Sequence, residues 1–213
     1  MKVFVVGANG QIGQHLVHLL QESNEHTVRA MIRNEEQAKA FETMGVETRL
    51  ADLEGSVEEI VEAARGCDAF VFTAGSGGHT GADKTILIDL DGAAKSIEAA
   101  TILGVKRFIM VSAIHANKRE NWSSLHYYMV AKHHADNILE QSGLTYTIIR
   151  PGGLLNEPGT GKVSIAEDLP TSSIPREDVA KTILATLTQE NTFNRSFDLV
   201  SGEDQISEAL NRV

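Results

Sequence analysis

The sequence predicts one α/β domain built on a doubly wound parallel sheet with helices on both of its faces. Two observations carry this prediction. A buried strand passes through a glycine turn into a helix at residues 2–20, and strand-like and helix-like segments alternate over most of the remaining chain. A helix between two strands returns the chain to the starting end of the sheet, so the strands run parallel, and such crossovers are right-handed. Since 213 residues are enough for one such core, we expect a single domain over residues 1–213.

The stretch KVFVVGANGQIGQHLVHLL at residues 2–20 is the motif around which this domain is organised. Residues 3–6 are apolar and β-branched or aromatic, which is typical of a strand covered on both faces. Gly7, Gly10 and Gly13 follow at three-residue spacing, and apolar residues then recur with a helical period. Such a turn lets the backbone approach a pyrophosphate and points the first N–H groups of the helix at it. A plain structural turn is the alternative, but a strand before the glycines and a helix after them favour a dinucleotide site.

Six further segments are predicted to be strands, because each contains a short apolar run with β-branched or aromatic residues. They are residues 26–33, 46–54, 67–75, 106–112, 144–151 and 196–202. The helices predicted between and after them are residues 34–45, 56–66, about 85–103, about 123–141, 175–187 and 203–213. Ser56 followed by Glu59 is the capping pattern of a helix start. With the strands numbered along the chain, we expect the sheet order 3-2-1-4-5-6-7.

Residues 152–175 interrupt this alternation, because they hold three of the four prolines and several glycines. We predict an irregular loop there, with one short strand at KVSI, residues 162–165. The loop follows the sixth strand and so lies on the substrate side, beyond the carboxyl ends of the strands. Two interpretations stay open. Apolar residues such as Leu154 and Ile165 close over a small substrate as a lid, or the segment is a poorly ordered connection.

The chain is acidic, with a net charge of −10 and a pI of about 5.2. Such a surface repels nucleic acid and anionic membranes, so we expect neither as a partner. The apolar runs are only of strand length, and the N-terminus begins on a strand without a charged leader, which predicts neither a spanning helix nor a signal peptide. We expect a cytoplasmic protein, a monomer or a homodimer, whose partner is a small-molecule substrate.

Cysteine and histidine usage gives no indication of a metal site. The single cysteine, Cys67, precludes an internal disulfide and a cysteine metal cluster, and its place before an apolar run predicts a buried thiol. No pair of the histidines has a carboxylate partner at metal-ligand spacing. We therefore expect a surface or loop position for His79, His115, His126, His133 and His134.

The end of the second strand predicts which dinucleotide is bound. In this architecture an acidic residue about 20 positions after the glycines holds the ribose 2′-hydroxyl of NAD, whereas this chain has Arg33 there, 20 residues after Gly13. A guanidinium pairs with a phosphate through two donors, which favours NADP; an ordinary surface arginine is the alternative. Asn9 in the turn is positioned to add a hydrogen bond. Asp52, followed by Leu53, closes the third strand, where its carboxylate either accepts from the adenine amine or begins a turn.

Tyr128 and Lys132 stand four residues apart in the helix predicted after the fifth strand, so their side chains share one helix face. An ammonium near a phenol stabilises the phenolate and lowers the tyrosine pKa, which makes the tyrosine a usable acid or base. The same lysine can donate to a nicotinamide ribose. A chance pairing is the alternative, but the position in the chain favours a functional one. Ser112 ends the fifth strand and faces the crevice at the sheet edge.

The glycine turn and the later motifs occur in the order found in one large family. With Tyr128-x-x-x-Lys132 and Arg150-Pro151-Gly152 in place, the chain resembles the short-chain dehydrogenase/reductase superfamily over nearly its whole length. GANGQIG has the spacing of the extended, epimerase-like branch, although the C-terminal substrate part of that branch is much reduced. The chain looks like the small atypical members, described as NAD(P)-binding or as sugar epimerases, and is similar also to biliverdin reductase B. The resemblance implies a Rossmann-type sheet that binds NADP through Gly7, Asn9, Gly10, Gln11, Ile12, Gly13, Arg33, Asp52, Leu53, Thr73, Ala74, Gly75, Lys132 and Pro151.

The resemblance also implies an activity. By this resemblance the chain is an NADP(H)-dependent oxidoreductase or epimerase that acts on a small carbonyl or sugar-type substrate. The resemblance makes Tyr128 the proton donor, Lys132 its partner and Ser112 the hydrogen-bond donor to the carbonyl. The chain departs from the family at Asp89, where asparagine is common. Asp89 is either a fourth catalytic candidate or a solvated helix residue, and its presence makes catalysis less certain than cofactor binding. A flavin or tetrapyrrole reductase and a non-catalytic NADP sensor are therefore the alternatives.

Overall fold

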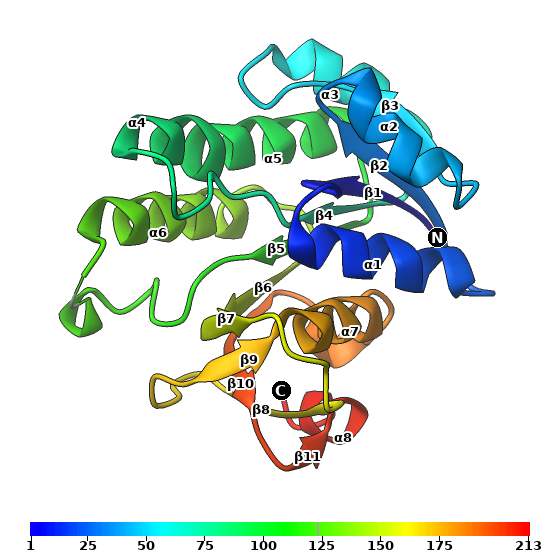
Figure 1. The fold of residues 1–213 in the computed structure, drawn as a ribbon. Helices are drawn as coiled ribbons and strands as arrows, with labels where there is room; N and C mark the ends of the chain where they lie inside the picture. Colours follow the sequence, from blue (N-terminus) through cyan, green and yellow to red (C-terminus); the bar gives the residue numbers. More distant parts are fainter. Residues whose placement is uncertain (123) are drawn as a thin grey trace.

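The central feature of the structure is a mostly parallel sheet of nine strands with helices on both faces (Figure 1). This computed structural model describes residues 1–122 and 124–213. The strands of the sheet are β1 (Lys2–Val6), β2 (Thr27–Ile32), β3 (Glu47–Leu50), β4 (Ala69–Phe72), β5 (Arg107–Val111), β6 (Tyr146–Pro151), β8 (Lys162–Ala166), β10 (Arg195–Ser201) and β11 (Asp204–Gln205). Their order is β11-β8-β10-β6-β5-β4-β1-β2-β3. The predicted fold class is confirmed, and the seven predicted strands stand in the predicted order, with β10 as the seventh.

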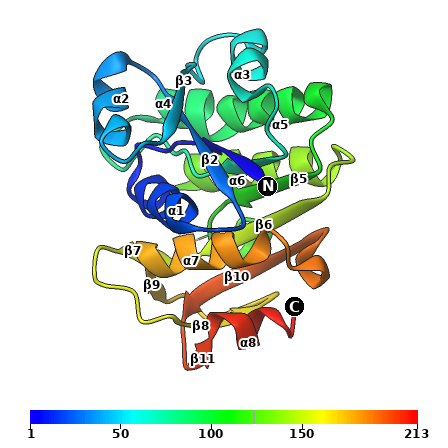
Figure 2. The ribbon, with the colours of Figure 1, turned by 90° about the vertical axis from the view of Figure 1, so that its right-hand side faces the viewer.

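Helices form a layer on each face of this sheet. They are α1 (Gln11–Glu22), α2 (Glu35–Glu42), α3 (Val57–Ala64), α4 (Ala82–Lys84), the π-helix η1 (Thr85–Asp91), α5 (Gly92–Leu103), the 3₁₀ turn η2 (Arg119–Asn121), α6 (His126–Glu140), α7 (Arg176–Thr186), the 3₁₀ turn η3 (Glu190–Thr192) and α8 (Ile206–Leu210). One face carries α1, α2 and α7, and the other carries α3, α5 and α6. Both views show α1 and α7 side by side (Figures 1 and 2). None of the described helices is long and apolar enough to cross a membrane.

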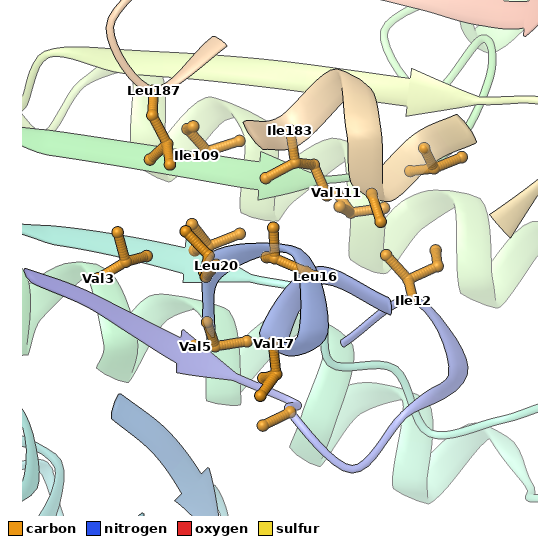
Figure 3. Packing of buried hydrophobic residues seen from close by; sticks show 14 of the residues in the cluster. Val3, Val5, Ile12, Leu16, Val17, Leu20, Ile109, Val111, Ile183 and Leu187 are labelled. Atoms are coloured by element: carbon orange, nitrogen blue, oxygen red, sulfur yellow. The ribbon is translucent and has the colours of Figure 1, made fainter. Parts of the chain in front are cut away.

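The central strands bury both of their sides because helices cover both faces of the sheet. On β1, Val3 and Val5 belong to the apolar cluster beneath α1 and α7, whereas Phe4 and Val6 belong to the cluster on the opposite face. Figure 3 shows the first cluster, in which Leu16 of α1 lies among side chains from β1, β5 and α7. Two-sided burial explains why β1 lacks the polar alternation of a half-exposed strand.

The segment predicted to be an irregular loop, residues 152–175, contains three strands. β8 includes the KVSI segment and pairs antiparallel with β10, and β11 then pairs with β8. The other two, β7 (Gly153–Leu155) and β9 (Ser173–Pro175), form a separate two-stranded sheet. The predicted strand at KVSI is confirmed as β8. β7 and β9 are only three residues long and pair with each other across the loop, so local composition does not indicate them.

The middle of this segment is tied to the first turn of α7. The Gly159 N–H donates to Glu177 Oε2 at 2.7 Å. The N–H groups of Thr160 and Gly161 donate to the buried Asp178 carboxylate at 2.8 and 2.9 Å. Backbone hydrogen bonds hold both its strands and its tip, so the segment is not a poorly ordered connection, and the lid interpretation stays a prediction.

The predicted helices are present with different bounds. The helix expected at about 85–103 contains the π-helix η1 before α5, and the closing helix begins only at Ile206 because β11 precedes it. The helix expected from about 123 is α6, which begins at His126, and residue 123 lies outside the described residues. Cys67 is buried as predicted, and burial raises the pKa of its thiol.

Glu47 holds the N-terminal edge of the sheet together through three cations. Its carboxylate lies 2.7 Å from Lys2 Nζ, 3.0 Å from Arg29 Nη2 and 2.8 Å from Arg49 Nη2. The hydrogen bond from Lys2, with those from Arg29, lowers the pKa of Glu47 to about 2 although partial burial opposes this. Arg29 is buried, so Glu47 also compensates a charge that has left water.

Replacing this carboxylate tests its contribution to stability. We expect Glu47→Gln to lower the free energy of unfolding at pH 7 by about 1–2 kcal/mol, a value reduced for the partial exposure of Glu47. The folded-state pKa lies below the ordinary value of 4.5, so the wild type has this contribution above pH 4.5 and loses it as the pH falls toward 2. Urea unfolding at both ends of that range measures it. Glu98→Gln, at an exposed position of α5, is the control, and equal effects of the two variants would contradict the argument.

Candidate functional site

The glycine turn brings the backbone of β1 and α1 into close contact. Gly7 has a φ of +84°, and a Cβ on it would lie 2.6 Å from Ala74 N. A Cβ on Gly13 would lie 2.2 Å from Gly7 O, so only glycine fits where α1 crosses the strand end. Gly10 is the N-cap of α1 and has no side chain to occupy the first N–H groups of the helix. The turn therefore leaves the positive end of α1 open to an anion.

The end of β4 lies against this turn. The Thr73 hydroxyl donates to Val6 O at 3.0 Å, and Thr73 Oγ1 also lies 3.3 Å from Gly7 O. Ala74 packs beneath Gly7, and Gly75 follows at the surface. The structure thus brings together the glycine turn and the Thr73-Ala74-Gly75 turn, two motifs that the sequence places more than 60 residues apart.

Asp89 connects the β4 turn to α6. It lies in the π-helix η1 and is 1% exposed. One carboxylate oxygen accepts the Ser76 N–H at 3.0 Å, and the other lies 3.1 Å from Lys132 Nζ. A π-helix displaces the side chains of the following turn and is frequent at functional sites. Here the π-helix contains Asp89, which pairs with Lys132 of α6.

Lys132 is buried between Asp89 and the end of β5. Its Nζ donates to Val111 O at 3.4 Å and lies 5.7 Å from the centre of the Tyr128 ring. Burial by itself lowers the pKa of Lys132, but Tyr128 and Asp89 raise it above its ordinary value, so the lysine keeps its charge. The neighbouring Ser112 directly follows β5. Its buried hydroxyl makes no hydrogen bond of standard geometry to the described residues, but it lies close enough to the Asp136 carboxyl to oppose the rise of that pKa.

Tyr128 does not have the lowered pKa that the sequence predicts. Burial raises the pKa of its phenol, and the attraction of Lys132 for the phenolate is opposed by Asp89 and Asp136. The reason is geometric, because the ammonium of Lys132 lies against a carboxylate and does not act on the phenol alone. Tyr128 therefore holds its proton at neutral pH and can donate it.

A second buried ion pair lies behind these residues. Arg150 Nε of β6 donates to Asp136 Oδ2 of α6 at 2.8 Å, and both residues are 1% exposed. Burial raises the pKa of Asp136, although Arg150 opposes this. Sequence reasoning missed Asp136. It could have been found by its spacing, because it stands four residues after Lys132 on the face of α6 that carries Tyr128.

The remaining residues predicted to bind the cofactor lie around the glycine turn and at the strand ends. Arg33 is exposed directly after β2, and its N–H donates to Gln37 Oε1 at 2.9 Å. Asp52 Oδ1 accepts the Glu54 N–H at 3.0 Å. This hydrogen bond is typical of an aspartate that begins a turn, which is the alternative to adenine binding for this residue. The other positions are exposed at Asn9 and Gln11 and buried at Ile12, Leu53 and Pro151.

The histidines follow the expected placement with two differences, at His133 and His115. His79, His126 and His134 are exposed, and His133 is partly buried in α6. His115 lies in the loop after β5, as expected for a loop residue, but it is buried and has a left-handed backbone with a φ of +61°. Nothing in the local sequence indicates this burial.

Comparison with known proteins identifies relatives over the whole chain. The profile of a family described as NAD(P)H-binding matches residues 7–190. A Bacillus subtilis protein named as an uncharacterized sugar epimerase, YhfK, is 64% identical, and the alignment covers 100% of both chains. A solved structure from Bacillus halodurans, provisionally named an NAD-dependent epimerase/dehydratase, is 42% identical with a TM-score of 0.94 and covers 100% of both chains. The oxidoreductase ylbE of Lactococcus lactis is 32% identical with a TM-score of 0.90, covering 100% of this chain and 96% of its own.

The close approach at Gly13 gives a direct test of the turn. We expect Gly13→Ala to lose most NAD(P)H binding and to lower the free energy of unfolding by about 1–3 kcal/mol, because the new Cβ would overlap the Gly7 carbonyl. Fluorescence titration with NADPH and urea unfolding measure the two effects. Gly78→Ala is the control, since a Cβ there would meet nothing within 4 Å. Unchanged cofactor affinity in Gly13→Ala would show that the turn does not carry the binding site.

Proposed function

This chain belongs to the NAD(P)H-binding family, and we propose that it is an NADP(H)-dependent oxidoreductase or epimerase that acts on a small carbonyl or sugar-type substrate. One observation carries the proposal, namely a continuous path of contacts from the glycine turn to Tyr128. The path runs from Gly7 to Thr73, from Ser76 to Asp89 and from Asp89 to Lys132. It joins a site for an anionic dinucleotide to a group that can transfer a proton, which is the combination that carbonyl reduction requires.

The residues present fit a nicotinamide dinucleotide. Gly7 and Gly13 allow the strand end, the Ala74 backbone and α1 to pack against one another, and Gly10 leaves the first N–H groups of α1 without a side-chain cap, which suits a pyrophosphate. In this proposal Arg33 binds the 2′-phosphate of NADP, and Lys132 donates to the ribose next to the nicotinamide. The bound cofactor supplies the hydride, while the protein orients it and holds the proton that completes the reduction.

The proton comes from Tyr128 in this proposal. Its raised pKa keeps the phenol protonated at neutral pH, so that it would donate this proton to the carbonyl oxygen of a bound substrate. Ser112, whose hydroxyl lacks a described partner, donates a hydrogen bond to the same oxygen. Lys132 stabilises the phenolate that remains. Asp89 weakens that stabilisation, because its carboxylate lies 3.1 Å from the ammonium.

A flavin or tetrapyrrole reductase is the second candidate function. The same Asp89–Lys132 pair favours it, because a phenol with a raised pKa is a weak acid catalyst and a substrate stacked on the nicotinamide needs little acid catalysis. A non-catalytic NADP sensor, the third possibility, would need no acid catalyst at all. The two experiments that follow separate cofactor choice from proton transfer.

The first experiment concerns Arg33. We expect wild-type protein to bind NADPH more tightly than NADH, and Arg33→Glu to weaken NADPH binding by roughly 10–100-fold because a charge-assisted hydrogen bond becomes a repulsion. Fluorescence titration with both nucleotides measures this. Arg195→Glu makes the same charge change at another exposed position and should leave the preference intact. Equal binding of both nucleotides by the wild type would leave Arg33 as an ordinary surface charge, whereas tighter binding of NADH would favour NAD, which the name of the Bacillus halodurans relative mentions.

The second experiment concerns Tyr128. NADPH oxidation is followed at 340 nm with aldehydes, sugars, quinones and flavins, for the wild type, Tyr128→Phe and the control Tyr127→Phe at the exposed neighbouring position. We expect Tyr128→Phe to lower the rate on a carbonyl substrate by about 10²-fold and Tyr127→Phe to leave it unchanged. Because the tyrosine pKa is raised, the wild-type rate should persist through neutral pH and fall only above about pH 10. If the wild type oxidises NADPH with flavins and Tyr128→Phe changes this rate little, the protein is the flavin or tetrapyrrole reductase. If no substrate is turned over, the result supports the non-catalytic NADP sensor.

A further inference from the structure

A histidine and two aspartates from three separate segments converge at the β8–β10 side of the sheet. His115 follows β5, Asp168 follows β8 and Asp198 lies within β10. His115 Nε2 is 3.7 Å from Asp168 Oδ1 and 3.7 Å from Asp198 Oδ2, and the three potential ligand atoms all lie within 4.8 Å of one another. The backbone carbonyl of Leu169 lies 2.7 Å from the same nitrogen.

We propose that this cluster binds a divalent transition-metal cation such as Mn²⁺ or Zn²⁺, with His115, Asp168, Asp198 and the Leu169 carbonyl as ligands. Imidazole nitrogen with carboxylate and carbonyl oxygen is a donor set that suits these cations. Ligand atoms about 2.0–2.2 Å from a metal lie roughly 3–4 Å from one another. The two separations of 3.7 Å fall in that range. The Leu169 carbonyl is only 2.7 Å from His115 Nε2, so metal binding requires that this hydrogen bond break and that the carbonyl move about 0.5–1 Å away from the ring.

The burial of the Asp198 carboxyl is the second observation that points to a cation. Its side chain is fully buried, and its oxygens accept the N–H groups of His115 at 3.5 Å and Leu169 at 3.2 Å. Its ionic contact in the described part of the chain is His115; no lysine or arginine lies within 4 Å. A buried carboxylate without a full countercharge is costly. A cation among these ligands would supply the missing positive charge.

Neighbouring residues hold the proposed ligands in place through an ion pair and hydrogen bonds, as residues around known metal sites do. Lys118 Nζ lies 2.7 Å from Asp168 Oδ2, which leaves Oδ1 directed toward His115. The His115 carbonyl accepts hydrogen bonds from Trp122 Nε1 at 3.0 Å and from Lys118 N at 2.9 Å. These bonds hold the left-handed backbone of His115 and thereby fix where its ring points.

The cluster has an entry path. An open cavity of about 460 Å³ lies beside it, lined by His115, Asn121, Asp168, Leu169, Pro170 and Thr171. Asp168 lines this cavity and is largely exposed, whereas Asp198 is buried behind His115, 3.7 Å from its Nε2. The cavity therefore offers both access for a hydrated cation and room for the water ligands that complete its coordination. The inference rests on none of the residues proposed for carbonyl reduction.

Calorimetric titration of the full chain, first dialysed against a chelator, tests the site with MnCl₂ and ZnCl₂ separately. We expect saturable binding of at least one cation to a single site that depends on His115 and Asp168. His115→Asn and Asp168→Asn should each weaken binding at least about 10-fold. Asparagine tolerates the left-handed backbone at position 115, and position 168 is exposed, so both variants should fold. His79→Asn and Asp83→Asn, at exposed positions elsewhere, are the matched controls.

A second measurement locates the ion. Mn²⁺ at substoichiometric amounts should broaden the ring resonances of His115 before those of His79 or His134, because paramagnetic broadening falls steeply with distance from the ion. Absence of saturable binding of either cation up to about 1 mM would overturn the inference. Binding that is equal in the wild type and in both ligand variants would also overturn it, since the cation would then occupy another site.

Discussion

The ion pair between Asp89 and Lys132 is the interaction on which the arrangement of the site depends. It joins the π-helix η1 to α6 across the carboxyl end of the sheet, and both side chains are almost wholly buried. Removing either partner would leave an uncompensated buried charge, which typically costs about 3–5 kcal/mol. The pair also sets the chemistry of Tyr128, because the lysine charge nearest the phenol is shared with a carboxylate.

The two halves of the sheet have different roles around this pair. β1 and β4 bring the glycine turn and Thr73 together, so one half presents backbone N–H groups toward a dinucleotide. The half formed by β5, β6 and β10 carries buried charges, among them Arg150 and Asp198. An acidic protein can still hold an anionic cofactor in this way, because helix N–H groups act locally and the net charge acts at long range.

The sequence predicted the elements whose residues are close neighbours in the chain. The strand, glycine turn and helix at residues 2–20 are recognisable because their period and spacing are local. The same holds for the Ser56 cap, whose hydroxyl accepts the Glu59 N–H at 3.3 Å. Prediction located β8 at its KVSI segment but failed for β7, β9 and β11. Each is short and is stabilised by pairing with a distant strand, which leaves little local signal.

The sequence by itself determined the fold class and the shared helix face of Tyr128 and Lys132, because periodicity and four-residue spacing are properties of the chain. Only the tertiary structure decided which charges meet. Lys132 faces Asp89 from 43 residues away, Arg150 faces Asp136, and His115 meets Asp168 and Asp198 across three segments. These pairings follow from burial, since a charge removed from water must find a partner among whichever side chains the folded sheet brings beside it. The pKa of Tyr128 and the histidine–aspartate cluster are consequences of that placement, and no pattern in the linear sequence contains them.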